Sequence, residues 1–330
     1  MIDVALQSGD ISKLSEGARS RALAKLRISD AAFFQLTRGS AILVLVILGG
    51  IIVSLILGAA LALGTFGLSF LITQTWNPVT EVFGAAAPIY GTVVTSAIAL
   101  LIAAPLGLLI ALFLTELCPM FLRRPIGIAI ELLAGIPSII YGIWGLFVFA
   151  PFLQRTLQPA LIDSFGNIPV LSTLFAGPPY GIGILTAGLI LAIMALPLIT
   201  SISRDVFETV PAVLKEAAYG VGCTTWEVFR HVVLPYTRVG VIGAIMLALG
   251  RVLGETMAVT FVIGNAHRIP TSLLAPGTTI SATIANEFTE AVGDLYTSSL
   301  IALGLVLFVI TFIVLAAARY MLMRLEQRVG

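Results

Sequence analysis

Residues 41–63 read AILVLVILGGIIVSLILGAALAL and contain no charged side chain. A helix of about 20 apolar residues is long enough to cross the hydrocarbon core of a bilayer. Further runs of comparable length and polarity follow along the chain. The predicted membrane spans lie at about residues 41–63, 89–114, 126–152, 181–202, 239–264 and 297–318.

The composition of the chain excludes a soluble globular protein. Hydrophobic residues make up 58% of the sequence and charged residues 11%, whereas soluble domains carry about 25% charged residues. Because lipid offers the backbone no hydrogen-bond partner, each span must satisfy its own backbone groups as a helix. We therefore expect an all-α, polytopic membrane protein with six transmembrane helices.

The basic residues are distributed unevenly between the two sides of the predicted membrane. Of the 18 lysines and arginines, only Arg155 and Arg268 fall in the loops of one side, and Arg251 falls inside a span. The others are Lys13, Arg19, Arg21, Lys25, Arg27, Arg38, Arg123, Arg124, Arg204, Lys215, Arg230, Arg238, Arg319, Arg324 and Arg328. Because basic loops face the cytoplasm, we predict a cytoplasmic N-terminal segment at 1–38, a membrane domain at 39–325 and a cytoplasmic tail at 326–330.

No metal site, cofactor site or catalytic group is expected in this chain. Cys118 and Cys223 fall on the predicted cytoplasmic side, where thiols stay reduced, and His231 and His267 fall on opposite sides of the membrane. No nucleophile, base and oxyanion donor converge in the sequence. The chain is therefore predicted to be a transport subunit and not an enzyme.

Two charged residues lie deep in the fifth predicted span, where a charge costs about 2.5–3.5 kcal/mol on insertion scales. Arg251 and Glu255 are one helical turn apart, so they can pair on one face. Gly250 and Gly254 form a G-x-x-x-G pattern, which lets a second helix approach closely. Because the guanidinium fork matches two oxygens of a tetrahedral oxyanion, we predict that Arg251 contacts an anion and that Glu255 neutralises it when no substrate is present. A static salt bridge between helices is the alternative.

Three further polar residues are candidates for the same translocation path. Glu131 lies about 9 Å into the third span at 1.5 Å per residue, ahead of a break expected at Pro137. It can pair across helices, for example with Arg251. Ser138 and Tyr141 follow the break and can donate hydrogen bonds to a passing oxyanion, although a packing role is open for all three.

The cytoplasmic loop at residues 204–238 is long enough to form two short helices of its own. Pro211 can start the first helix, and Gly222 permits the tight turn that follows it. Thr224 and Glu227 have the spacing of a capping box at the start of the second helix. The loop is therefore predicted to be an exposed helix-turn-helix.

This loop resembles the EAA loop of ABC importer permeases. The pattern is E-A-A, three residues, G, nine residues, an apolar residue, one residue and then L-P, with Val232 where that family usually has isoleucine. Its positions are Glu216, Ala217, Ala218, Gly222, Leu234 and Pro235. The second helix is expected to stop at the Leu-Pro pair, and Trp226 and Phe229 are expected to be apolar anchors. The resemblance implies that these residues, with Trp226, form a coupling helix that docks on an ATPase chain; an ordinary surface hairpin is the alternative.

Four longer stretches resemble one branch of that family, the phosphate permeases of ABC importers (PstC type). They are residues 88–95 (PIYGTVVT), 126–151 (IGIAIELLAGIPSIIYGIWGLFVFAP), 219–228 (YGVGCTTWEV) and 250–265 (GRVLGETMAVTFVIGN). The resemblance extends from the first span to Arg324. It implies a type I ABC importer permease fold and a channel-forming subunit of an ATP-driven phosphate importer in the bacterial inner membrane. Arg251 and Glu255 match the charged pair of that family's transport path.

The resemblance also implies the partners. These are a second, related permease (PstA type), two copies of an ATPase (PstB type) and a periplasmic phosphate-binding protein (PstS type), with inorganic phosphate and membrane lipid but no nucleic acid. Since this chain has no G-x-x-x-x-G-K-[ST] phosphate loop, ATP must be hydrolysed by the separate ATPase. Family members also take part in phosphate sensing.

Three other functions are alternatives to this interpretation. A permease for another tetrahedral oxyanion, such as sulfate or molybdate, would also use an intramembrane arginine, and only the resemblance favours phosphate. A secondary transporter would show inverted repeats, and none is evident. A membrane sensor that carries nothing would have less need of charges deep in the membrane.

Overall fold

The computed structural model describes residues 16–166, 168–169 and 171–326, which are predominantly helical. The chain divides into two compact units, Met1–Leu57 and Gly58–Gly330. In the first unit the described residues form one helix, α2 (Glu16–Phe66), whose last turns belong to the second unit. Among the described residues, strand-like pairing is limited to one isolated bridge between Asn77 and Val82.

Six helical stretches of the described residues are long and apolar enough to cross a membrane. They are Ser29–Phe66, Ala86–Leu117, Ser138–Phe165, Ile184–Glu208, Thr225–Leu253 and Asp294–Arg324. The predicted all-α class with six membrane helices is therefore confirmed. Of the predicted terminal segments, residues 1–15 and 327–330 lie outside the described residues.

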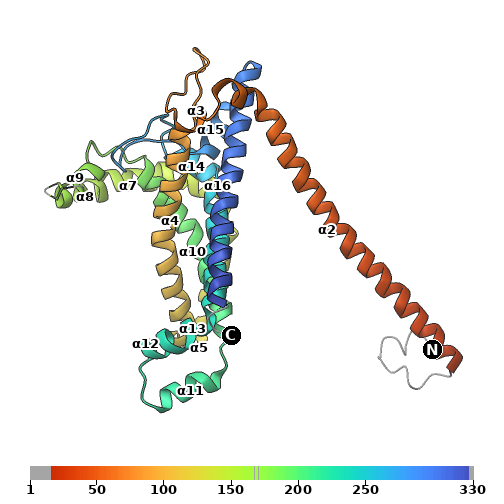
Figure 1. Cartoon of the computed structure of the whole chain (residues 1–330). Helices are drawn as coiled ribbons and strands as arrows, with labels where there is room; N and C mark the ends of the chain where they lie inside the picture. Colours follow the sequence, from red (N-terminus) through yellow and green to blue (C-terminus); the bar gives the residue numbers. More distant parts are fainter. Residues whose placement is uncertain (1–15, 167, 170, 327–330) are drawn as a thin grey trace. The chain divides into compact units, whose positions relative to one another are not determined.

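The second unit contains many short helices between its long ones (Figure 1). In chain order they are α3 (Ser69–Ile72), α4 (Ala86–Leu112), η2 (Phe113–Leu117), α5 (Met120–Ala134), α6 (Ser138–Trp144), η3 (Gly145–Phe149), α7 (Ala150–Arg155), α8 (Leu157–Phe165), α9 (Leu171–Leu174), α10 (Ile184–Glu208), α11 (Ala212–Gly220), α12 (Thr225–Val228), η4 (Phe229–Val233), α13 (Leu234–Leu253), α14 (Met257–Val262), α15 (Ile280–Glu287) and α16 (Asp294–Glu326), where η marks a π-helical turn.

Helix α10 is the centre of the second unit, and it packs against α4, α5, α13 and α14. Its contact with α4 depends on small residues. A methyl group at Gly188 would lie 2.7 Å from Ile98 Cγ2, and one at Gly107 would lie 2.8 Å from Ile199 Cγ2. Because glycine leaves this room, the two backbones approach closely, and dispersion contacts stabilise the pair in a setting where lipid supplies no hydrophobic drive.

A half-buried carboxylate stabilises the end of the unit where α3 and α15 lie, opposite α11 and α12 (Figure 1). Glu287 accepts hydrogen bonds from Trp76 Nε1 and from Tyr296 Oη at 2.6 Å, and it pairs with His267 Nε2 at 2.7 Å. Burial raises the pKa of Glu287, but the bonds from His267, Tyr296 and Trp76 outweigh it and hold the pKa below its usual value. This cluster joins the loop after α14 to α15, α16 and the loop before α4.

Candidate functional site

The third predicted span is divided into two helices, α5 and α6, at residues 135–137. Pro137 has no backbone N–H and disfavours a helical conformation at Ile136 before it, so the break predicted at Pro137 is confirmed. Across the break, Tyr141 Oη donates a hydrogen bond to the Leu133 carbonyl at 2.9 Å. This bond satisfies one of the carbonyls that the end of α5 leaves free.

Tyr141 and Ser138 therefore differ in how they can meet an anion. The single hydroxyl proton of Tyr141 is committed to Leu133, so donation to an oxyanion requires that bond to open. Ser138 is half-buried in the first turn of α6. Both residues lie just beyond the break, where the sequence placed them.

The fifth predicted span is also divided, at a break that the sequence analysis did not predict. α13 ends at Leu253 and α14 begins at Met257. The predicted pair between Arg251 and Glu255 is wrong for this structure: in the part of the chain that is described, no ion pair joins them. The helix that would hold them one turn apart stops between them, and Glu255 Oε1 instead accepts a bond from the Ala258 N–H at 3.4 Å.

The close helix approach expected at the G-x-x-x-G pattern occurs elsewhere. A methyl group at Gly250 would meet only Leu315 Cδ1, at 3.8 Å, and one at Gly254 would be 3.8 Å from a carbonyl of its own helix. By contrast, a methyl group at Gly142 of α6 would lie 3.0 Å from the Ala258 Cα of α14. The two helices that follow the breaks therefore pack backbone against backbone.

The packing of α6 on α14 brings the two breaks together in space. Arg251 lies in the last turn of α13, directly before the second break. Its side chain is exposed. A permanently protonated guanidinium at this place can bind an oxyanion through two parallel hydrogen bonds.

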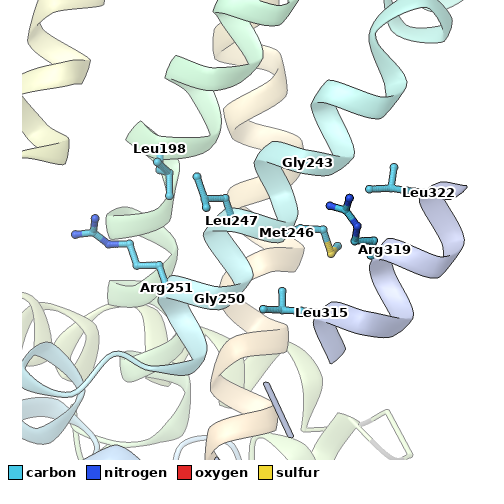
Figure 2. Close-up of a pocket in the computed structure, with 9 residues that line it drawn as sticks. All are labelled: Leu198, Gly243, Met246, Leu247, Gly250, Arg251, Leu315, Arg319 and Leu322. Atoms are coloured by element: carbon cyan, nitrogen blue, oxygen red, sulfur yellow. The ribbon is translucent and has the colours of Figure 1, made fainter. Parts of the chain in front are cut away.

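A cavity of about 710 Å³ lies beside Arg251 (Figure 2). The lining residues come from α10, α13 and α16 and are Leu198, Gly243, Met246, Leu247, Gly250, Arg251, Leu315, Arg319 and Leu322. Arg251 extends to one side of α13 and Arg319 lies on the other side (Figure 2). Among these nine residues the two arginines carry the only charges, and the other seven are apolar or glycine.

Glu131 pairs with Arg204 of α10 and not with Arg251. Arg204 Nη2 lies 2.8 Å from Glu131 Oε1 and 3.0 Å from Asp205 Oδ1. Arg204 was predicted to lie in the cytoplasmic loop, but α10 extends to Glu208, so Arg204 is a helical residue. The pair joins α5 to α10 just before the first break.

The predicted helix-turn-helix contains the two expected helices, α11 and α12. Gly222 lies between them with φ +93°, a conformation that favours glycine. Thr224 Oγ1 accepts a bond from the Glu227 N–H at 3.4 Å, and Glu227 Oε2 accepts one from the Thr224 N–H at 2.8 Å. The predicted capping box is therefore confirmed.

The stop predicted at Leu234 and Pro235 is wrong. From Thr225 the helix continues through η4 into α13, and Pro235 lies in the first turn of α13. Proline removes one N–H donor from the helix, and the wider π-helical turn directly before it accommodates the lost bond without ending the helix.

The coupling residues named from the sequence are mostly at the surface. Glu216, Ala217, Gly222, Trp226 and Pro235 are exposed, and Ala218 and Leu234 are half-buried. Of the two expected anchors, Phe229 is buried against Phe207 of α10, with ring centroids 5.4 Å apart, whereas Trp226 is 53% exposed. Phe229 thus fastens the loop to the bundle and leaves the indole of Trp226 open.

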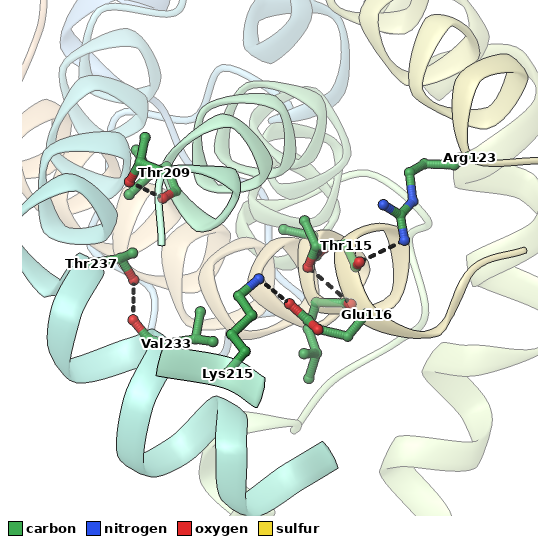
Figure 3. Close-up of polar contacts among 10 residues, drawn as sticks. Thr115, Glu116, Arg123, Thr209, Lys215, Val233 and Thr237 are labelled. Atoms are coloured by element: carbon green, nitrogen blue, oxygen red, sulfur yellow. Dashed lines mark hydrogen bonds and ion pairs between the residues drawn. The ribbon is translucent and has the colours of Figure 1, made fainter. Parts of the chain in front are cut away.

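An ion pair that the sequence analysis missed joins α11 to the end of the second span (Figure 3). Lys215 Nζ lies 2.6 Å from Glu116 Oε1, and their side chains are only 18% and 10% exposed. Arg123 Nη2 donates to the neighbouring Thr115 carbonyl at 2.6 Å. Lys215 and Glu116 lie 99 residues apart in the chain, so no local pattern could have revealed this ion pair.

Comparison with known proteins identifies a family and several similar proteins. A family model described as binding-protein-dependent transport system inner membrane component matches residues 103–327. The phosphate transport system permease protein PstC of Mesorhizobium japonicum is 72% identical over 95% of this chain and 96% of its own length. PstC of Pasteurella multocida is 57% identical over 92% and 94% of the two chains, and the probable PstC of Methanocaldococcus jannaschii is 41% identical over 82% and 86%.

Solved structures support the fold. A chain of a bacterial ABC transporter involved in the import of the acidic polysaccharide alginate matches with a TM-score of 0.59 and 16% identity, covering 92% of this chain and 98% of that one. A second alginate ABC transporter structure, in complex with a pentasaccharide-bound periplasmic protein, matches with a TM-score of 0.53, 15% identity and coverage of 90% and 96%. At such identities the likeness concerns the fold alone, and it confirms the predicted ABC importer permease fold.

Proposed function

The chain belongs to the family of binding-protein-dependent transport system inner membrane components, and from this premise we propose that it forms part of the membrane channel of an ATP-driven importer of inorganic phosphate. It is a multi-pass inner-membrane protein and a transport subunit. The choice of phosphate rests on the relatives named PstC, which match nearly the whole chain at up to 72% identity.

The exposed guanidinium of Arg251, at the meeting point of the two broken spans, is the observation that supports a path for an anion. The energetic cost of a charge among apolar residues is high, and Arg251 has no carboxylate partner in the described residues that would offset it. A phosphate oxyanion would supply the missing negative charge. Arg251 then compensates the charge of phosphate as it passes, and Glu255 and Ser138 lie beside the same path.

The α11–α12 segment is the surface through which ATP hydrolysis drives this path. It presents apolar side chains to solvent, namely Val213, Leu214, Tyr219, Val221 and Trp226, and exposed apolar residues gathered in one short segment favour a docking site. Its attachments run inward through Lys215 to Glu116 and through Phe229 to Phe207. A push on α11 would therefore move the ends of the second and fourth spans.

If an ATPase docks at this segment, the positions of the other partners follow. The α11–α12 end faces the cytoplasm, with both chain termini on the same side, as the basic residues favour. A second permease (PstA type) completes the channel, two ATPase subunits (PstB type) bind below it, and a periplasmic phosphate-binding protein (PstS type) docks at the opposite end near α15. ATP binding closes the ATPase pair and opens the channel outward, phosphate passes Arg251, and hydrolysis resets the inward-open state.

Uptake of labelled oxyanions tests the substrate. Cells that lack this chain are supplied with low external phosphate or sulfate, with and without a plasmid copy of the chain. We expect the plasmid to restore high-affinity phosphate uptake and to leave sulfate uptake unchanged. Restoration of sulfate uptake alone, at equal membrane levels of the chain, would overturn the assignment to phosphate.

A further inference from the structure

A second group of positive charges lies between α5 and α10, at the same end of the unit as α11 and α12 (Figure 1). It surrounds a cavity of about 430 Å³. The lining residues are Met120, Arg123, Arg124, Ile128, Glu131, Arg204 and Glu208. Its three arginines exceed its two carboxylates, Glu131 and Glu208, by one positive charge.

Arg204 reaches this cavity because Gly127 leaves room for it. A methyl group at Gly127 would lie 2.4 Å from Arg204 Nη1, so any larger residue there would displace the guanidinium. Gly127 is buried, and it forms a recess on α5 over which the guanidinium lies. The position of Arg204 is therefore fixed by the shape of α5 as well as by its carboxylate partners.

The carboxylates around the cavity do not occupy all of its donors. Asp205 accepts from Arg204 Nε and Nη2, Glu131 accepts from Nη2, and the side chain of Glu131 is 49% exposed. The Arg123 Nε is buried and has no hydrogen-bond partner among the described residues. Buried donors normally have an acceptor, so Arg123 retains one donor without a partner among the described residues.

The cavity lies close to the first break. Glu131 lies one helical turn before the break that begins at Gly135, and Tyr141 bonds across that break to Leu133 of the same turn. Arg251 lies directly before the second break, and the helix that follows that break, α14, packs against α6.

We propose that this cavity is a second binding site for a tetrahedral phosphate-type oxyanion, in which Arg204 exchanges Glu131 for the ligand while Arg123 and Arg124 supply further donors. The exchange is easy because an exposed ion pair such as the one with Glu131 contributes little, whereas a guanidinium binds an oxyanion with two parallel bonds. The oxyanion has one of two sources. It is transported phosphate that leaves the channel toward the cytoplasm, in which case the inference rests on the proposed function, or it is the headgroup of an anionic lipid.

Transport by the complete importer complex tests this site and separates the two sources. The complex, with its ATPase and binding protein, is reconstituted into vesicles of phosphatidylcholine alone or with phosphatidylglycerol, and ATP-driven uptake of labelled inorganic phosphate is measured. If the ligand is transported phosphate, Arg204→Gln lowers the uptake rate by about tenfold in both vesicles. If the ligand is a lipid headgroup, the loss is confined to vesicles with phosphatidylglycerol, and the variant retains less of that lipid on purification.

Two further variants distinguish a binding site from a structural ion pair. Glu131→Gln removes the carboxylate that competes with the anion for Arg204, so uptake is expected to rise above the normal rate. Gly127→Ala retains every charge but displaces Arg204, so it is expected to reduce uptake in the same vesicles as Arg204→Gln does. Assembly and basal ATP hydrolysis show that each variant complex is intact.

The inference is overturned if uptake by Arg204→Gln is normal in both vesicles. It is also overturned if Glu131→Gln is as damaging as Arg204→Gln and the double variant recovers, because that pattern belongs to a pair that only joins α5 to α10. If the normal complex takes up no phosphate, the proposed function is contradicted instead. The site is then tested by lipid binding alone, and it is overturned if Arg204→Gln retains as much phosphatidylglycerol as the normal complex does.

Discussion

The contact between α6 and α14 can be tested by adding one methyl group at Gly142. The new carbon would lie 2.8 Å from Phe261 Cδ2, 3.0 Å from the Ala258 Cα and 3.1 Å from the Met257 carbonyl oxygen. Carbon atoms in good contact lie about 3.5–4.0 Å apart, so the two helices would have to separate by roughly half an ångström or more. Two of the three neighbours are backbone atoms, which cannot rotate away. Overpacking of this kind costs about 1–3 kcal/mol.

The expected result of Gly142→Ala is a complex that assembles but transports poorly. A penalty of about 1–3 kcal/mol against the packed state lowers its population by about 5- to 150-fold. The rate of phosphate uptake should decrease by a factor in the same range. Gly49→Ala in α2 is the matched control, since a methyl group there would meet nothing within 4 Å among the described residues. Uptake above half of the normal rate, with an unchanged melting temperature, would refute the packing of the two breaks against each other.

Three further predictions concern other parts of the chain. Lys215→Met leaves the buried carboxylate of Glu116 unpaired and should destabilise the complex by about 3–5 kcal/mol in thermal unfolding. The double variant with Glu116→Leu should recover much of this stability. An equal loss of stability in both variants would contradict the ion pair. Gly222→Ala places alanine at φ +93°, a conformation that costs about 1–2 kcal/mol. Phosphate uptake should therefore fall while basal ATP hydrolysis persists. Normal uptake would show that this turn is not part of the coupling to the ATPase. The folded-state pKa of Glu287 is held below its usual 4.5, so its stabilisation is present above pH 4.5 and is lost as the pH falls through the folded-state value. Glu287→Gln should remove this part of the acid sensitivity of the melting temperature, and the exposed Glu290→Gln should not.

Much of the architecture follows from local patterns in the sequence. Apolar runs predict the membrane helices because length and polarity alone decide whether a helix can cross lipid. The capping box of Thr224 and Glu227 and the break at Pro137 were predicted for the same reason, since each depends on residues within one helical turn. These features need no knowledge of the rest of the fold.

The partners of the charged residues could not be predicted in this way. Arg251 and Glu255 have the spacing of a helical pair, but α13 ends between them, and nothing local distinguishes Gly254 at a helix end from a glycine at a helix contact. Glu131 finds Arg204, 73 residues away, because α5 and α10 happen to pack together. Such pairs depend on tertiary structure, which the spacing of charges along one segment does not contain.

The most direct test of the central claim is phosphate uptake by Arg251→Gln in cells that lack the native chain. Arg155→Gln is the control, because it also removes one arginine, from an exposed position at the end of α7. With equal amounts of each variant in the membrane, we predict that Arg155→Gln restores high-affinity uptake and that Arg251→Gln does not. Normal uptake by Arg251→Gln would show that phosphate crosses the membrane without this guanidinium and would contradict the path proposed between the two broken spans.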